Sequence, residues 1–186
     1  MAQTRPGRVL FGEEEIARRV RELGGEITAY YRDRGVVEVT VVSVLKGGFV
    51  FLADLVRHLD LDLRLDFMAI SSYHHAGERP RGVRILQDLS QSIYRRRVLL
   101  VEDIIDTGLT LSYVLRNLGE REPAEIRLCA LLDRALRRIA PIELHHRGFE
   151  VGEEFLVGYG LDYRQRWRNL PCICVLEEPA SQGLIR

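Results

Sequence analysis

Three carboxylates, two threonines and a glycine gather within nine residues near the middle of the chain. They belong to the segment LVEDIIDTGLTL, residues 100–111, which continues the apolar run 98–101. Glu102 and Asp103 stand where this expected buried strand ends. Because adjacent carboxylates repel one another, they favour a partner that is a cation or carries hydroxyl groups. A magnesium ion or a ribose diol fits, since both need hard oxygen acceptors.

The second half of this segment, DTGLT at 106–110, has the composition of an anion-binding turn. Backbone N–H groups of a glycine-containing turn at the start of a helix attract an anion. Thr107 and Thr110 add hydroxyl donors. The alternative interpretation is an ordinary helix N-cap supplied by Asp106 or Thr107. The full pattern EDIIDTGLT directly after a strand favours the anion site over the cap.

The elements that must position these residues alternate along the chain. Helices are expected at 13–33, 47–59 and 109–120, where apolar residues recur with helical spacing, and a loop at 71–83. Strands are expected at 36–45, 63–70, 83–89, 98–102, 125–133, 143–149, 155–158 and 172–176. The alternation predicts an α/β fold with a doubly wound, mainly parallel sheet flanked by helices. Ligands of such sheets bind beyond the carboxyl ends of the strands, where the acids lie.

Composition narrows the class of protein. A chain of 186 residues predicts one domain, and 27 basic against 27 acidic residues give no net-charge argument for a nucleic-acid or membrane partner. The N-terminus lacks an apolar signal-peptide core, so we expect a cytoplasmic protein. The odd count of three cysteines argues against a disulfide framework. Among the 27 basic residues only Lys46 is a lysine.

Four segments, taken in order, resemble a known family. The pattern EDIIDTGLT is similar to the phosphoribosyl-diphosphate (PRPP) signature of type I phosphoribosyltransferases, in the form typical of the hypoxanthine/guanine enzymes. VLKGGFVFLADLV resembles the family's diphosphate-binding loop and the helix that follows it. DFMAISSY resembles the strand that leads into its active-site lid, and GFEVGEEFLVGYGLDYRQRWRNLP resembles its purine-binding hood. The likeness extends from about residue 36 to 176.

The resemblance implies a fold, an activity and partners. The fold is the type I phosphoribosyltransferase fold in a single domain, residues 1–186, with a core at about 36–140 and a mobile lid at about 71–83. A small hood is built from N- and C-terminal segments, at about 1–12 and 141–186. The implied reaction is purine salvage: Mg²⁺-dependent transfer of the 5-phosphoribosyl group from PRPP to N9 of hypoxanthine or guanine, giving IMP or GMP and diphosphate. Family members are dimers or tetramers, so a homodimer or homotetramer is expected.

The signature residues take roles by the same resemblance. Glu102 and Asp103 hold the ribose hydroxyls and the metal around them, and Asp106 lies near purine N7 as general acid/base. Five consecutive residues enclose the 5′-phosphate through their backbone groups: Asp106, Thr107, Gly108, Leu109 and Thr110.

Residues outside the signature take the remaining roles. Lys46 and Gly47 contact diphosphate, with the peptide bond before Lys46 cis. Ser72 and Tyr73 belong to the lid that closes over diphosphate and excludes water. A set in the hood completes the implied site: Phe155 stacks on the purine, Leu156 offers backbone groups to the base, Asp162 is a second magnesium carboxylate beside the purine, and Arg168 contacts diphosphate.

One position departs from the family pattern. In LLDRALRR, residues 131–138, the residue after Asp133 is normally a lysine that donates to purine O6, and here it is Arg134. A planar guanidinium has a fork of donors and can span O6 and N7, at the expense of the contact expected of Asp106. It can instead turn away and bind diphosphate or an acid. On either account adenine is expected to be a poor substrate, because its 6-amino group presents donors to a donor.

Two other functions compete with this assignment. The first is a PRPP-responsive regulator that binds nucleic acid instead of catalysing, for which the residues before 36 leave no room for an added domain. Loss of Asp106 would favour it, and Asp106 is present. The second is a phosphoribosyltransferase for another base. The hood segment disfavours adenine, uracil and orotate, whereas xanthine stays open beside hypoxanthine and guanine.

Overall fold

The computed structural model describes residues 4–72 and 83–177. A six-stranded sheet forms its centre, in the order β4-β3-β2-β5-β6-β7. Its strands are β2 (Glu38–Leu45), β3 (Asp62–Ser72), β4 (Val83–Gln87), β5 (Arg97–Ile105), β6 (Glu125–Asp133) and β7 (His146–Glu150). All neighbours are parallel except β4, which is antiparallel to β3. The predicted mainly parallel sheet is confirmed.

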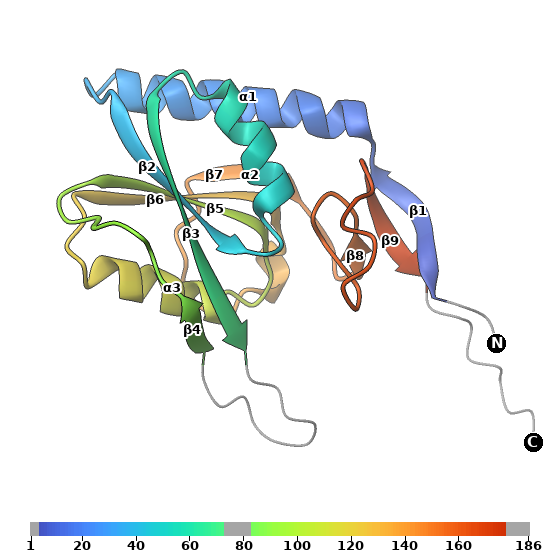
Figure 1. Ribbon diagram of the computed structural model, residues 1–186. Helices are drawn as coiled ribbons and strands as arrows, with labels where there is room; N and C mark the ends of the chain where they lie inside the picture. Colours follow the sequence, from blue (N-terminus) through green and yellow to red (C-terminus); the bar gives the residue numbers. More distant parts are fainter. Residues whose placement is uncertain (1–3, 73–82, 178–186) are drawn as a thin grey trace, which may run out of the picture.

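Helices cover both faces of this sheet, as Figure 1 shows. On one face lie α1 (Glu13–Arg32), α2 (Phe49–Leu55) and the short 3-10 helix η1 (Val56–His58), and on the other lies α3 (Leu109–Gly119). Side chains of β5 alternate between the two layers: Leu99 and Val101 join the core under α1 and α2, whereas Val98 and Leu100 join the core over α3. Burial on both faces explains why this strand is a continuous apolar run.

Two consecutive glycines lie within α1, which nevertheless runs without interruption from Glu13 to Arg32. Gly24 is buried, and a Cβ added there would lie 2.5 Å from the Cβ of His58 and 2.7 Å from its carbonyl oxygen. Gly25 is exposed and has no atom within 4 Å of such a Cβ. The first glycine therefore allows α1 to pack closely against η1.

A separate three-stranded antiparallel sheet lies beside the large one and forms the hood. Its strands are β1 (Arg5–Phe11), β9 (Ile173–Glu177) and β8 (Leu156–Val157), in that order. The N-terminal and C-terminal parts of the chain thus build the hood together, as predicted. A strand at 5–11 was not predicted.

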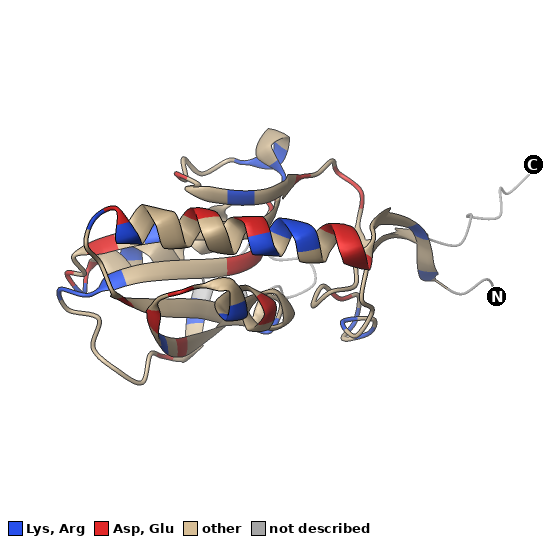
Figure 2. Cartoon of the chain, turned by 90° about the horizontal axis from the view of Figure 1, so that it is seen from above, with Lys and Arg blue, Asp and Glu red and all other residues tan. Residues whose placement is uncertain are grey.

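The surface carries both charge signs close together. Figure 2 shows acidic and basic residues interspersed along α1. Among the described helices, none is long and apolar enough to cross a membrane.

Candidate active site

The two adjacent acids lie within β5, which continues to Ile105. The expectation that the strand ends at residue 102 was therefore wrong. Because successive side chains of a strand point to opposite faces, the acids separate: Glu102 lines one cavity and Asp103 lines another. Burial, with the neighbouring Asp103 carboxylate, raises the pKa of Glu102 well above its usual value. Burial raises the pKa of Asp103 to about 6, although the Ile104 N–H donates to Asp103 Oδ1 over 2.9 Å.

The first cavity, here called the turn cavity, has a volume of about 220 Å³ and lies against the start of α3. It is lined by Val44, Ile70, Glu102, Ile104, Ile105, Asp106, Thr107, Gly108, Thr110, Leu111 and Val114. Gly108 is the N-cap of α3 and has a left-handed φ of 78° with no side-chain cap. A Cβ on Gly108 would lie 2.7 Å from Ile142 Cδ1, so glycine is needed here for backbone and packing reasons.

The capping alternative is wrong in this structure, because neither Asp106 nor Thr107 occupies the N-cap position. Thr107 Oγ1 accepts only a long contact of 3.5 Å from the Leu109 N–H. The carbonyl of Thr107 accepts hydrogen bonds from the N–H groups of Ile139 and Ala140, at 2.9 and 3.2 Å. These bonds tie the turn to the segment after β6. The first N–H groups of a helix have no partner within the helix, so those of α3 can donate to an anion.

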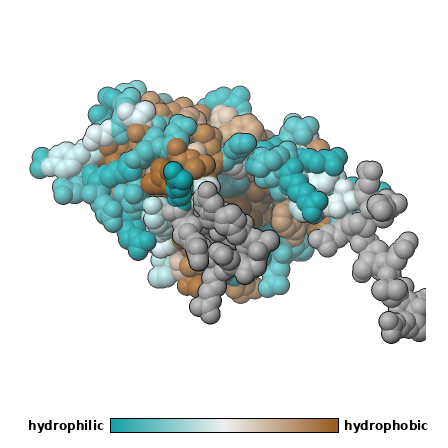
Figure 3. All heavy atoms as spheres, turned by 60° about the horizontal axis from the view of Figure 1, so that its bottom comes forward, coloured by the Kyte–Doolittle hydropathy of each residue, from teal (hydrophilic) through white to brown (hydrophobic). Residues whose placement is uncertain are grey.

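The second cavity, here called the hood cavity, has a volume of about 300 Å³ and lies between the large sheet and the hood. It is lined by Gly47, Asp103, Ile104, Asp106, Arg134, Phe155, Leu156, Leu161, Asp162 and Arg168. These residues come from four segments far apart in sequence. Figure 3 shows hydrophobic side chains lining a recess between the large-sheet part and the hood. The two cavities share Ile104 and Asp106, and together they contain most of the residues that the sequence assigned to one site.

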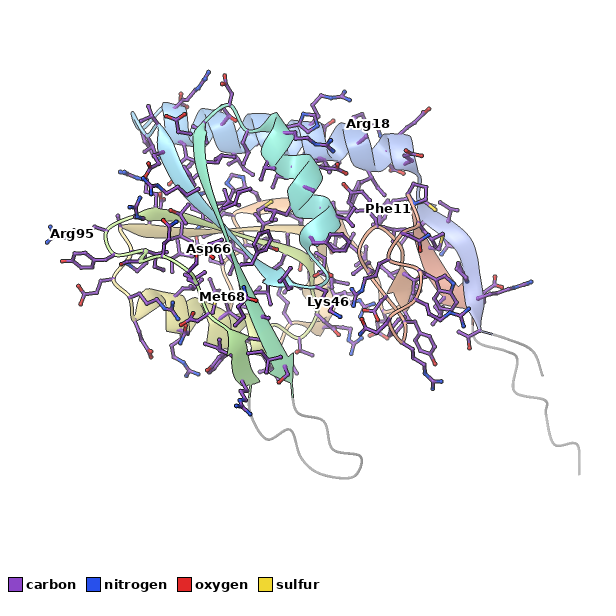
Figure 4. All side chains as sticks on the ribbon, viewed as in Figure 1. Phe11, Arg18, Lys46, Asp66, Met68 and Arg95 are labelled. Carbon is purple, nitrogen blue, oxygen red and sulfur yellow. The ribbon has the colours of Figure 1, made fainter. Side chains whose placement is uncertain are left out.

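The loop after β2 reaches this cavity from the core. The peptide bond between Leu45 and Lys46 is cis, as predicted. Lys46 is exposed and lies at the carboxyl end of β2, labelled in Figure 4. A Cβ on Gly47 would lie 1.8 Å from Asp103 Oδ2, and one on Gly160 would lie 2.3 Å from the Gly47 carbonyl oxygen. The loop, β5 and the hood therefore approach one another at backbone distance.

Asp106 is in contact with two arginines. Arg134 Nη1 lies 3.4 Å from Asp106 Oδ2, and Arg137 Nε lies 3.2 Å from Asp106 Oδ1. Arg134 is buried, and its Nη2 donates to the Glu154 carbonyl over 2.5 Å. Of the expected behaviours of Arg134, the structure shows the one in which the side chain binds an acid. Arg137 was not singled out in the sequence, because its contact with Asp106 depends on a short turn after β6 that the apolar pattern does not indicate.

The hood contributes an ion pair and an aromatic group. Arg168 Nη2 lies 2.6 Å from Asp162 Oδ1, and Arg168 Nη1 donates to the Gly160 carbonyl over 2.6 Å. Phe155 is 51% exposed and meets Tyr163 edge-on, with ring centroids 5.6 Å apart. Tyr163 stacks in turn on Trp167 at 6.1 Å. Phe155 is therefore a supported ring with an accessible face, and Tyr163 is a support that the sequence did not single out.

Part of the predicted site lies outside the described residues. Tyr73 and the lid segment 73–82 fall there, and Ser72 is the last residue of β3. Within residues 4–72 and 83–177, no three His, Cys, Asp or Glu side chains form a cluster that could hold a metal ion by themselves.

Comparison with known proteins agrees with the fold. A parallel sheet with a glycine-containing turn at one strand end and a hood over it is the arrangement of the phosphoribosyltransferase class. The model of the phosphoribosyl transferase domain matches residues 12–164. The chain is 45% identical over 170 residues to the hypoxanthine-guanine phosphoribosyltransferase of Bacillus subtilis (strain 168), covering 91% of this chain and 93% of that one.

Other relatives give the same result. Identity to the hypoxanthine phosphoribosyltransferase of Escherichia coli (strain K12) is 45% over 165 residues, covering 89% of this chain and 92% of that one. A crystal structure of a hypoxanthine-guanine phosphoribosyltransferase from Bacillus anthracis superposes with a TM-score of 0.86 at 36% identity, covering 95% of this chain and all of that one. This chain belongs to the phosphoribosyltransferase family, in its hypoxanthine and hypoxanthine-guanine branch.

Proposed function

We propose that this protein transfers the 5-phosphoribosyl group from PRPP to N9 of hypoxanthine or guanine in purine salvage, releasing diphosphate. The observation that supports this most is the hood cavity, where Asp103, Asp106, Arg134 and Phe155 meet. An acid, a cation and an aromatic ring around one space of about 300 Å³ suit a planar base with a carbonyl oxygen and a protonated ring nitrogen. The turn cavity beside it suits a phosphorylated sugar.

In this proposal the turn cavity holds the ribose 5′-phosphate. The backbone N–H groups from Asp106 to Thr110 donate to the phosphate oxygens, and the hydroxyls of Thr107 and Thr110 add to them. Glu102 reaches the ribose from β5. Burial and the neighbouring Asp103 carboxylate raise its pKa, and ribose hydroxyl donors would stabilise its ionised form.

The purine lies in the hood cavity. Phe155 stacks on the base, the Leu156 backbone meets its edge, and Arg134 donates to O6. Asp106 faces N7 and moves the proton there as the bond to N9 forms, a contribution typically worth about 10²–10⁴ in rate. The cavity also raises the rate by holding N9 of the base in line with C1′ of the ribose. This position matters because departure of diphosphate leaves cation-like character on the ribose.

Diphosphate is held by Lys46, Gly47 and Arg168, and the lid residues Ser72 and Tyr73 exclude water from the ribose.

Mg²⁺ fits the donors present, because Asp103 and Asp162 face the same hood cavity and Glu102 lies on the other side of β5. Mg²⁺ typically binds one or two carboxylates together with substrate phosphates and waters, which agrees with the lack of a three-ligand cluster in the described residues. When bound, the ion would neutralise charge on the diphosphate. We further propose a homodimer or homotetramer, as the family resemblance implies.

A substrate panel tests the proposed function. The protein is incubated with PRPP and Mg²⁺ and with hypoxanthine, guanine, xanthine or adenine in turn, and nucleotide and diphosphate are measured. We expect efficient formation of IMP, GMP or both. Preferred use of xanthine or adenine would replace the base in this proposal, and diphosphate release from PRPP with no base would contradict the transfer.

A regulator that binds nucleic acid is the second candidate, and the mixed charges on α1 do not favour it. A salt-dependent RNA-binding measurement separates the two functions. Tight binding together with an inactive substrate panel would favour the regulator.

A further inference from the structure

The two oxygens of Asp106 have different surroundings. Oδ1 is buried and makes no hydrogen bond with any residue that the structure describes, while the whole side chain is 41% exposed. The exposed part therefore belongs mainly to the rest of the carboxylate, where Asp106 lines both cavities. Oδ1 faces Arg137 Nε at 3.2 Å, and Oδ2 faces Arg134 Nη1 at 3.4 Å. Each oxygen thus has its own cation.

Both arginines reach Asp106 because of the short 3-10 helix η2 (Ala135–Arg137) that follows β6. Arg134 is the N-cap of η2, and the Arg137 N–H donates to the Arg134 carbonyl over 2.9 Å. Side chains three residues apart in a 3-10 turn lie on the same side. The Arg134 N–H also donates to the Ile105 carbonyl over 2.9 Å, which fixes this turn beside the end of β5.

A bound base would compete with Asp106 for Arg134 but not for Arg137. Arg134 lines the hood cavity, so a 6-oxopurine that accepts a hydrogen bond from it competes with its contact to Asp106 Oδ2. Arg137 is absent from the lining of both described cavities. Its contact with Oδ1 can therefore persist while a base is bound. Release of Oδ2 alone would leave that oxygen facing N7.

Resting on the proposed function, we propose that Arg137 is a positioning residue that holds Asp106 Oδ1, so that Oδ2 meets purine N7. Arg137 touches neither substrate and acts through Asp106. The Arg137 side chain is 39% exposed, so its ion pair with Asp106 adds little to the stability of the fold. The contribution of the ion pair is instead to fix the orientation of the Asp106 carboxylate. Loss of alignment at a reacting group lowers the rate strongly, up to about 10²-fold for a misplacement of about 1 Å.

The test compares Arg137→Met, which keeps the length of the side chain and removes its charge, with Arg137→Lys. We expect Arg137→Met to lower kcat with hypoxanthine about 10-fold, with the KM for PRPP nearly unchanged because the phosphate-binding turn is intact. Arg137→Lys should recover most of the loss. Arg121→Met is the matched control: Arg121 pairs with Asp88 at 2.8 Å and lines neither cavity, so the same charge is lost without effect on kcat.

A double-mutant cycle shows whether Arg137 acts through Asp106. In an Asp106→Asn background, Arg137→Met should change kcat less than 2-fold, because the carboxylate that it positions is gone. Thermal melts establish that each variant is folded. An equal loss in both backgrounds, or a loss matched by Arg121→Met, would overturn the proposal while leaving the proposed function intact. An unmodified protein that forms no nucleotide from any base would overturn both.

Discussion

Gly47 and Asp103 are in contact through backbone and carboxylate, so closely that a single methyl group on Gly47 would lie 1.8 Å from Asp103 Oδ2. One residue follows a strand end and the other lies within the neighbouring strand β5. No ordinary side chain fits between them. The loop that carries Lys46 is thereby set against a carboxylate of the hood cavity.

Gly47→Ala should therefore impair function more than stability. Either the loop or the Asp103 carboxylate must move by more than an ångström, and a displacement of that size at a reacting group costs about 10²-fold. We expect kcat/KM for PRPP to fall about 10-fold or more in steady-state assays. Gly12→Ala is the control, since nothing lies within 4 Å of its added Cβ. Wild-type kinetics of Gly47→Ala would contradict the contact.

The two glycines of α1 offer a matched pair for stability. Gly25→Ala adds a methyl group to an exposed helix position with free space, so it should stabilise the protein by about 0.5–1 kcal/mol. Gly24→Ala places a Cβ 2.5 Å from the Cβ of His58 and should destabilise by about 1–3 kcal/mol through overpacking. Chemical denaturation of both variants measures the difference. Equal changes in the free energy of unfolding for the two variants would show that η1 can move aside to accommodate the methyl group at position 24.

The buried acids make the metal-free protein less stable as pH rises. Burial raises the pKa of Asp103 from 3.8 to about 6, so between these values the folded state binds more protons than the unfolded state. The free energy of unfolding must then fall as pH rises through this window. The raised pKa of Glu102 acts in the same direction.

Asp103→Asn should remove the loss of stability that ionisation of the Asp103 carboxylate causes. Melting temperatures in the presence of a chelator measure this effect. We expect the variant to melt higher than the unmodified protein at about pH 7.5 and to differ less at about pH 4.5. Its activity should be lost, which is the usual relation between a strained site and stability. Asp62→Asn changes an exposed acid on β3 and serves as control. A variant that melts lower at both pH values would show that the carboxylate stabilises the fold.

Arg134→Lys examines the departure from the family pattern. Lysine cannot contact Asp106 and the Glu154 carbonyl with two separate fork nitrogens, as Arg134 does. We expect kcat/KM for hypoxanthine and guanine to change by no more than roughly 1–3 kcal/mol, the scale of one pocket contact. Steady-state assays with each base measure this. Adenine should remain a poor substrate, and its efficient use by the unmodified protein would remove Arg134 from base selection.

Local pattern predicted the long elements well. The bounds of β6 and α1 follow directly from apolar periodicity, and the signature EDIIDTGLT placed the site at the carboxyl edge of the sheet. The strand β1 was missed because RPGRVLF has a proline and a glycine and pairs with β9, more than 160 residues away. Propensity cannot report a partner so distant in sequence.

The site was predicted as a set of residues and only partly as an arrangement. Adjacent acids suggested one shared partner, but the pleat of β5 sends Glu102 and Asp103 to different cavities. Arg137 was not predicted, because its proposed role depends on the 3-10 turn after β6 and no apolar pattern indicates that turn. The contact of Arg134 with the hood depends equally on how two distant segments pack.

The exclusion of lysine from all positions but one gives this chain an unusual chemical handle. Lys46 has the only side-chain amine in the chain, and it is exposed at the loop beside the hood cavity. An acylating reagent that modifies ε-amino groups therefore has a single side-chain target. The N-terminal α-amine reacts as well, so the mass of the peptide that contains Lys46 is the readout that reports whether that loop is open or occupied, without mutation.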